Sequence, residues 1–169
     1  MKKLFTVFLV IIISGCSTTS NIKTEQQFKK SLKGYSSITI KIIADTDVMN
    51  NSDYNKVKEN LLTSIGEKIT PRTGLQHLPA DNAADLSINV EVKSFVYTSQ
   101  GARIMFGIMS GKAELNTDIS LVENKTGKVL WKVHTDTSSK TSEGIFGGST
   151  TTQIETLSDQ IITHLQDSI

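Results

Sequence analysis

The sequence predicts an α+β fold, a two-layer sandwich in which two helices cover one face of a mixed, mostly antiparallel sheet of about five strands. Three successive segments alternate apolar and polar residues, which is typical of strands with one covered face and one face in water. Two further segments repeat apolar residues at helical spacing, so two helices are available to cover the sheet. The expected order is β-α-β-β-β-β-α, an arrangement of layers common in α+β domains.

The first strand and the first helix are expected between residues 37 and 71. Apolar residues alternate with polar ones over 37–43, which predicts a strand. The run Asn-Asn-Ser-Asp at 50–53 offers several helix caps, and Pro71 is expected to end the helix. Between these limits the apolar stripe of an amphipathic helix is formed by Tyr54, Val57, Leu61, Ile65 and Ile69.

Four more strands are expected in the centre of the chain. Residues 74–78 form a short candidate bounded by prolines, which favours a sheet edge. Residues 85–93 alternate cleanly, and the apolar phase slips after Ser94, which indicates a bulge or a change of face. Residues 112–122 and 128–137 alternate in the same way. The side chains expected on the covered face are Leu86, Ile88, Val90, Val92, Ala113, Leu115, Ile119, Leu121, Val129, Trp131 and Val133.

A turn and a second helix complete the predicted fold. The run Asn-Lys-Thr-Gly at 124–127 ends on a residue suited to positive φ and joins the last two strands. Thr152 and Glu155 match the capping-box pattern, which predicts a helix that begins there. Its apolar stripe is expected to contain Ile154, Leu157, Ile161, Leu165 and Ile169.

The N-terminus has the layout of a secretory signal. Lys2 and Lys3 precede the apolar run 4–13, which is too short to span a bilayer as a helix. Two small residues then lead to Cys16, the only cysteine of the chain. This pattern resembles the lipobox of bacterial lipoproteins. The resemblance implies cleavage between Gly15 and Cys16 and a covalent lipid on Cys16, which is the only cofactor-like group we expect.

The expected organisation is therefore a signal peptide over 1–15, a flexible tether over 16–34 and a single periplasmic domain over 35–169. The tether is rich in Ser, Thr, Lys and Gln. Ser17 follows the cysteine where lipoproteins retained at the inner membrane usually have Asp. By analogy with that family, the domain is expected at the outer membrane, facing the periplasm.

Charge and residue types exclude several kinds of partner. Removing Lys2 and Lys3 from 18 basic residues leaves 16 against 17 acidic ones, a net charge of −1, so nothing favours nucleic acid. His77, His134 and His164 fall on three different predicted elements without ligand spacing, so we expect no metal site. No catalytic residue is assigned, because the chain has no nucleophile-elbow pattern.

Two alternatives to a binding module remain open. Glu91, Glu114 and Asp118 lie on the polar faces of predicted strands and could approach one another across the sheet, as an envelope hydrolase would need. A small apolar ligand could instead be carried between the helices and the sheet. A convergent pocket with a perturbed carboxylate would favour the enzyme, whereas an exposed apolar loop would favour the module.

An apolar loop is the strongest candidate for a contact surface. Residues 101–111 join two amphipathic strands, where a polar turn would be expected, and residues 144–149 are again apolar and framed by glycines. Contiguous apolar exposure marks a partner or a membrane. We expect the two loops to emerge at related positions on the sheet and to contact an envelope protein or a second copy. The expected contact residues are Ile104, Phe106, Met109, Ile145 and Phe146.

Several short motifs occur in the order found in an uncharacterised family of small bacterial lipoproteins, which this chain resembles over roughly residues 37–165. The motifs are Ala84-Asp85-Leu86, Gly101, Arg103, Gly107, Gly111-Lys112-Ala113-Glu114-Leu115 and Thr126-Gly127-Lys128-Val129-Leu130. The resemblance implies a fold similar to the periplasmic modules of the TolB N-terminal region, the curli secretion lipoprotein and the penicillin-binding-protein activator lipoproteins. These relatives bind partners or assemble, which implies the same class of function.

Overall fold

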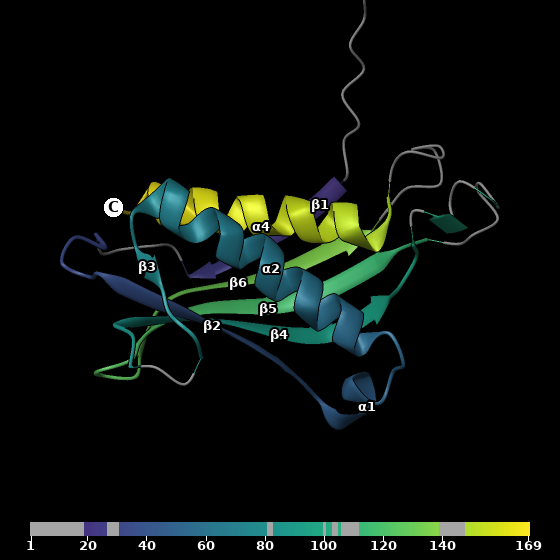
Figure 1. Ribbon diagram of the computed structural model, residues 1–169, viewed down its shortest axis with the longest axis horizontal. Helices are drawn as coiled ribbons and strands as arrows, with labels where there is room; N and C mark the ends of the chain where they lie inside the picture. The colour runs from purple at the N-terminus through teal and green to yellow at the C-terminus, as the bar shows by residue number, and fades with distance from the viewer. Residues whose placement is uncertain are drawn as a thin grey trace, which may run out of the picture.

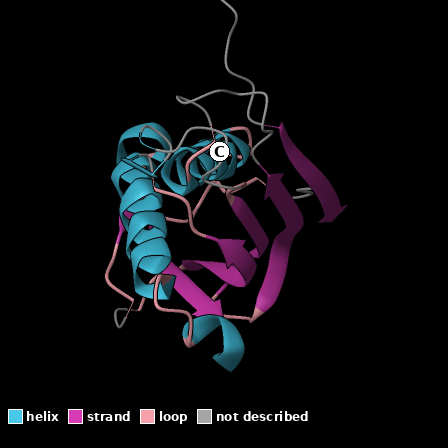
Figure 2. Ribbon diagram, turned by 90° about the vertical axis from the view of Figure 1, so that its right-hand side faces the viewer, coloured by secondary structure: helices cyan, strands magenta, loops and turns pink. Residues whose placement is uncertain are grey.

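Two helices lie on one face of an open sheet in the computed structural model of the chain (Figures 1 and 2). The structure describes residues 19–26, of which only the backbone is considered, and residues 31–80, 83–99, 101–102, 105, 112–138 and 148–169. The elements are β1 Thr19–Gln26, β2 Ser37–Ala44, α1 Thr46–Met49, α2 Tyr54–Thr73, β3 Gln76–His77, β4 Leu86–Val96, β5 Glu114–Glu123, β6 Lys128–Ser138 and α4 Thr150–Gln166.

The strand order is β1-β6-β5-β4-β2-β3. β4, β5 and β6 form an antiparallel meander, β1 adds to it antiparallel beside β6, and β2 is parallel to both of its neighbours, β3 and β4. The predicted α+β sandwich with a mixed, mostly antiparallel sheet is confirmed. The two-residue β3 lies at an edge, as its flanking prolines indicated.

The core lies between the inner face of the sheet and the two long helices. All five residues of the predicted α2 stripe are buried, because spacings of three and four residues put them on one side of the helix. They pack against the inner residues of β2, β4 and β5, so each element contributes one apolar face. The predicted inner residues with no solvent exposure are Leu86, Ile88, Val90, Val92, Ala113, Leu115, Ile119 and Leu121.

The predicted change of phase in β4 is a bulge. The pairing with β5 shifts between Val92 and Ser94, after which Phe95 is opposite Leu115. Phe95 is partly buried against the core, while Val96 is 48% exposed. The extra residue therefore restores the apolar phase to the inner face.

The prediction that Val129 is buried is wrong. The β5–β6 register shifts between Leu121 and Val122, so that Trp131 lies opposite Leu121 and Val129 opposite Val122. Leu130 is the extra residue of this second bulge, and it is 7% exposed whereas Val129 is 38% exposed. Trp131 and Val133, which follow the bulge, are buried as expected.

Both long helices have ends that differ from the sequence-based expectation. Pro71 lies inside α2, which continues to Thr73 although the proline lacks an N–H to donate within the helix. Gly74 then takes a left-handed conformation, φ 75°, and its N–H bonds to Thr70 O. α4 begins at Thr150, two residues before Thr152. Its cap is Ser149, whose hydroxyl accepts from the N–H of Thr152.

The expected tether differs from the structure at residues 19–26. This segment forms β1, which pairs with β6 from Thr19 opposite Ser138 to Gln26 opposite Lys132. Its polar composition concealed the strand, because strand formation depends on pairing context more than on intrinsic propensity.

At the other end of the chain, Ile169 is 41% exposed, so the apolar stripe of α4 ends at Leu165 instead.

Candidate functional site

One end of the sheet brings together the places where the two apolar connections begin and end. Val96 of β4 lies opposite Glu114 of β5, Glu114 lies opposite Ser138 of β6, and Ser138 also lies opposite Thr19 of β1. The β4–β5 and β6–α4 connections therefore leave from neighbouring positions, as expected for the two loops. Figure 1 shows the C-terminal ends of β4 and β6 and the first turn of α4 on the same side of the molecule.

The predicted cleavage and lipidation residues, Gly15 and Cys16, lie outside the described residues. The predicted contact residues also lie outside them, namely Ile104, Phe106, Met109, Ile145 and Phe146. Met105, which belongs to the first of these loops, is described and is 79% exposed. A large apolar side chain is therefore in water at the tip of the β4–β5 connection.

Buried polar contacts fix the frame from which these loops leave. Thr98 and the first residue of α4, Thr150, exchange two hydrogen bonds: Thr150 N donates to Thr98 O at 3.0 Å, and Thr98 N donates to Thr150 Oγ1 at 2.9 Å. Gln153 Nε2 donates to Ala113 O at 2.7 Å. The start of α4 is thus tied to the end of β4 and to the residue before β5, which gives the two connections a rigid base.

The outer face of the sheet brings two of the three predicted carboxylates together. Glu91 and Asp118 are directly opposite each other on β4 and β5, and Lys93 forms ion pairs with both. Glu114 lies four residues from Asp118 along β5, about 13 Å away at the usual rise of a strand, so it is not part of this group. His134 of β6 adds a fourth member, because its Nδ1 lies 2.7 Å from Asp118 Oδ1.

The electrostatics of this cluster favour an ionised carboxylate. The hydrogen bond from His134 is the main cause that lowers the pKa of Asp118, and the positive charge of Lys93 lowers it further. A general acid at neutral pH needs a raised pKa, so Asp118 is poorly suited to protonate a leaving group. The arrangement supplies ion pairs within β4 and between β4 and β5, and a hydrogen bond from β6.

The other histidines also have structural surroundings. The ring of His164 on α4 lies against Trp131, with the ring centroids 5.3 Å apart and the planes tilted by 42°. The side chain of His77 is close to Gly66 of α2. Within the part of the chain that the structure describes, no three His, Cys, Asp or Glu side chains are placed to hold a metal ion together. Over the same residues, neither long helix combines the length and apolar character that crossing a bilayer requires.

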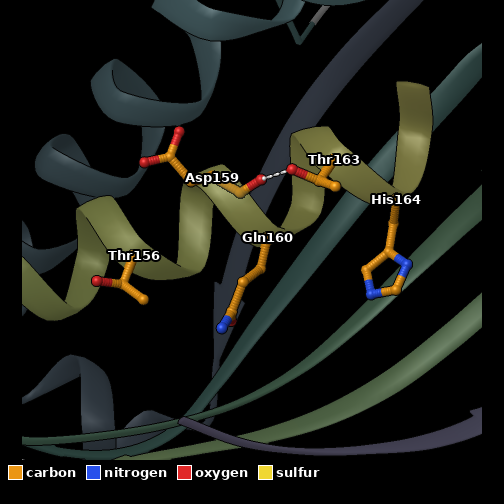
Figure 3. Close-up of a pocket in the computed structure, with 5 residues that line it drawn as sticks. All are labelled: Thr156, Asp159, Gln160, Thr163 and His164. Carbon is orange, nitrogen blue, oxygen red and sulfur yellow. Dashed lines mark hydrogen bonds between the residues drawn. The ribbon is translucent and has the colours of Figure 1, made fainter. Parts of the chain in front are cut away.

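A surface depression of about 320 Å³ lies along α4, lined by Thr156, Asp159, Gln160, Thr163 and His164. Gln160 and His164 extend toward the strands in Figure 3, whereas Asp159 points away from them. Asp159 is held by Arg72 of α2, whose Nη1 donates to Asp159 Oδ1 at 2.7 Å. This depression therefore adjoins an ion-paired helix contact and contains no free charged group that would select a ligand.

The described core between the helices and the sheet is filled with side chains. The buried residues of α2 and α4 form one cluster with those of the strands, and most of them have at most 1% exposure. The possible carrier function needs a cavity at this level, and these tightly packed side chains do not favour it.

Sequence comparison places the chain in a family. Residues 11–142 match the family described as domain of unknown function DUF4410, which is more than half of the chain. The chain belongs to the DUF4410 family. The match extends through all six strands. No curated protein matches this DUF4410 chain at a significant level.

Solved structures share the fold at low sequence identity. A PelC dodecamer from Paraburkholderia phytofirmans is 11% identical with a TM-score of 0.62, and a variant of that PelC dodecamer is 12% identical with a TM-score of 0.59. Each match covers 88% of this chain and 98% of the other. A DUF4136 family protein from Bacteroides thetaiotaomicron is 15% identical, with a TM-score of 0.49, and its match also covers 88% of this chain and 98% of the other. The similarity to PelC establishes a common fold.

Sequence reasoning missed Lys93 and His134 as members of the outer-face cluster. Lys93 could have been found, because it shares the polar face of its strand with Glu91. His134 could not, because without the bulge at Leu130 the 124–127 turn would align Asp118 with Val133 instead. Register across a hairpin depends on such irregularities, which alternation alone does not reveal.

Proposed function

We propose that this DUF4410 chain is a lipid-anchored envelope lipoprotein that acts as a protein-binding or assembly module and associates with further copies of itself. A covalent lipid on Cys16 would anchor it to the outer membrane, with the domain in the periplasm. The contact surface is formed by the two apolar loops. No catalytic step is assigned to the outer-face carboxylates.

The main support is the position of Thr19. Thr19 lies opposite Ser138 at the end of the sheet from which both loops leave. Cys16 precedes Thr19 by three residues, which reach at most about 10 Å when extended. A lipid at Cys16 therefore keeps the loop end of the domain close to the membrane surface.

Anchoring at this end would favour association between neighbouring copies. Molecules confined to one membrane meet at a much higher effective concentration than free molecules in solution. Apolar loops next to the anchor would face each other in that layer. The PelC structures, which share the fold, are described as dodecamers, and this supports self-association as the form that assembly takes.

The test uses the full chain in its native membrane. Ile104→Ser, Phe106→Ser and Met109→Ser are combined in one variant, and chemical crosslinking is followed by separation of the anchored products by mass. We expect crosslinked oligomers of the wild type and none of the loop variant. If the three side chains form a contact surface as proposed, the melting temperatures of the two proteins should agree, because surface substitutions change stability little.

A matched control changes two exposed apolar residues at the opposite end of the domain. Val129 and Ile169 are 38% and 41% exposed, and the variant with both changed to Ser should keep its oligomers. If the melting temperature of the loop variant falls well below that of the wild type, the loops belong to the core. If it keeps its oligomers, the contact surface lies elsewhere. Either result contradicts the proposal.

A further inference from the structure

A second depression lies on the outer face of the sheet, at the end opposite the loops. It has a volume of about 530 Å³, within the usual range of about 300–1,000 Å³ for small-molecule sites. Its lining residues come from β2, from the segment that leads into β4 and from the β5–β6 turn. Figure 1 shows the starts of β2 and β4 and this turn on one side of the sheet. Its lining consists of Thr39, Lys41, Ala80, Ala83, Ala84, Asp85, Asn124 and Lys125.

Hydrogen bonds hold the walls of this depression in place. Asp85 Oδ2 accepts from the backbone N–H and the hydroxyl of Ser36, both at 2.8 Å, and from the same two groups of Ser37, both at 3.1 Å. Asn124 Nδ2 donates to Ala84 O at 2.7 Å, and Asn124 Oδ1 accepts from Ser87 Oγ at the same distance. The site is therefore preorganised and needs no ligand to assemble it.

The lining has an excess of positive charge. The side chains of Lys41 and Lys125 form no ion pair or hydrogen bond with any other residue that the structure describes. The carboxylate of Asp85 is already bonded by four donors, which lower its pKa. Two ammonium groups thus remain available at the rim for an anionic ligand.

A buried hydroxyl at the floor has no partner. Thr39 is 1% exposed, and its Oγ1 makes no hydrogen bond among the described residues. The amide oxygen of Asn89, which is opposite Lys41 in the register, is buried and unpaired as well. Unpaired buried polar atoms are costly, so the unpaired hydroxyl of Thr39, which lines the depression, indicates a missing partner. Rotation of Thr39 about its Cα–Cβ bond moves its hydroxyl between three staggered positions.

We propose that this depression, the Lys41–Lys125 site, binds a phosphate monoester of a small polyol. A phosphate monoester has a charge of about −1.5 to −2 at neutral pH, which matches two ammonium groups better than a carboxylate does. Phosphate alone would fill a small part of the volume, so the polyol occupies the rest. The Thr39 hydroxyl donates to a phosphate or polyol oxygen.

The position of the site favours a water-soluble ligand over a membrane lipid. β4 runs the length of the sheet between the two ends, and its 11 residues span about 33 Å at the usual rise per residue. With the loop end near the membrane, the Lys41–Lys125 site faces away from it. Binding of the ligand does not depend on that anchoring, and the site can be tested independently of self-association.

The test is isothermal titration calorimetry on the full chain in detergent at low ionic strength. Glycerol 3-phosphate is the probe. Glycerol is the comparison that lacks the charged phosphate, and inorganic phosphate is the comparison that lacks the polyol. We expect glycerol 3-phosphate to bind more tightly than inorganic phosphate, and glycerol not to bind. Lys41→Gln and Lys125→Gln should each weaken binding about tenfold or more, as loss of a hydrogen bond to a charged group does. Lys112→Gln, an exposed change at the opposite end, should leave affinity unchanged.

Thr39→Val separates a binding role from a structural one. Because the hydroxyl is unpaired in the free protein, its removal should leave the melting temperature unchanged or raise it, while affinity for glycerol 3-phosphate falls. Absence of wild-type binding, equal affinity in the lysine variants, or equal affinity for inorganic phosphate would each overturn the proposal. A lower melting temperature of Thr39→Val would overturn the role of its hydroxyl.

Discussion

His134 Nδ1 lies 2.7 Å from Asp118 Oδ1, joining β6 to β5 on the outer face of the sheet. The two residues are directly opposite in the register, so the backbone alone brings their side chains together. Lys93 reaches the other carboxylate oxygen of Asp118 from β4, at 3.7 Å. One carboxylate therefore links the three strands of the meander.

Because of this link, the stability of the fold should fall as the pH becomes acidic. The pKa of Asp118 is lower in the folded chain than in the unfolded one, so the folded state favours the ionised carboxylate. Its contribution is complete above the ordinary pKa of Asp, about 3.9, and is lost as pH falls through the lower, folded-state pKa. We expect Asp118→Asn to destabilise the chain by up to about 1 kcal/mol at pH 6, with the difference shrinking below pH 4.

Urea unfolding of the wild type and of Asp118→Asn between pH 6 and pH 2.5 measures this difference. Asp136→Asn is the control, because it removes the same charge from an exposed position on β6. A gap between wild type and Asp118→Asn that stays constant across this range would contradict the role of the ionised carboxylate.

Trp131 should dominate the stability of the β6 side of the core. Its side chain is 2% exposed and lies against His164 of α4. Trp131→Ala should lower the free energy of unfolding by about 3–5 kcal/mol, because large aromatic deletions leave cavities. As the only tryptophan, it should also emit at short wavelength in the native chain. Emission typical of water would show that this position is not buried.

The bulge at Leu130 predicts opposite outcomes for two valines on one strand. Val133 is 1% exposed and Val129 is 38% exposed. We expect Val133→Ala to cost roughly 2 kcal/mol and Val129→Ala to stay within about 0.5 kcal/mol. Chemical denaturation of the two variants tests the register, since uninterrupted alternation would make their costs similar.

Lipid attachment at Cys16 is tested by metabolic labelling with a fatty acid. Cys16→Ser should abolish the label, because the serine hydroxyl lacks the nucleophilicity of a thiolate, and the protein should remain unprocessed or be released. The comparison protein is the loop variant with Ile104, Phe106 and Met109 changed to Ser, which keeps the cysteine and should keep the label. Equal labelling of wild type and Cys16→Ser would exclude the assignment.

Alternation and helical spacing predicted the layers well because burial imposes them directly. The inner faces of β4 and β5 and the stripe of α2 follow from repeats of two and of three to four residues. Tyr54 and Ile69, at the two ends of that stripe, are both buried as the spacing required.

Long-range pairing explains what the sequence did not reveal. β1 contains one large apolar residue, Ile22, so its strand depends on the edge offered by β6. The outer-face cluster required the β5–β6 offset, and the Lys41–Lys125 site required the approach of the β5–β6 turn to β2. None of these three contacts follows from a local repeat in the sequence, since each depends on how separate segments of the chain meet.

The pairing of Thr19 with Ser138 also bears on the order in which the chain folds. Roughly 120 residues separate these partners, so closing that loop is entropically costly and must await the arrival of β6. The edge strand β1 is therefore expected to pair last. Under the proposed anchoring, signal cleavage and lipid transfer at Cys16 would then precede the pairing of β1 with β6, so the chain would complete its fold only after its attachment to the membrane.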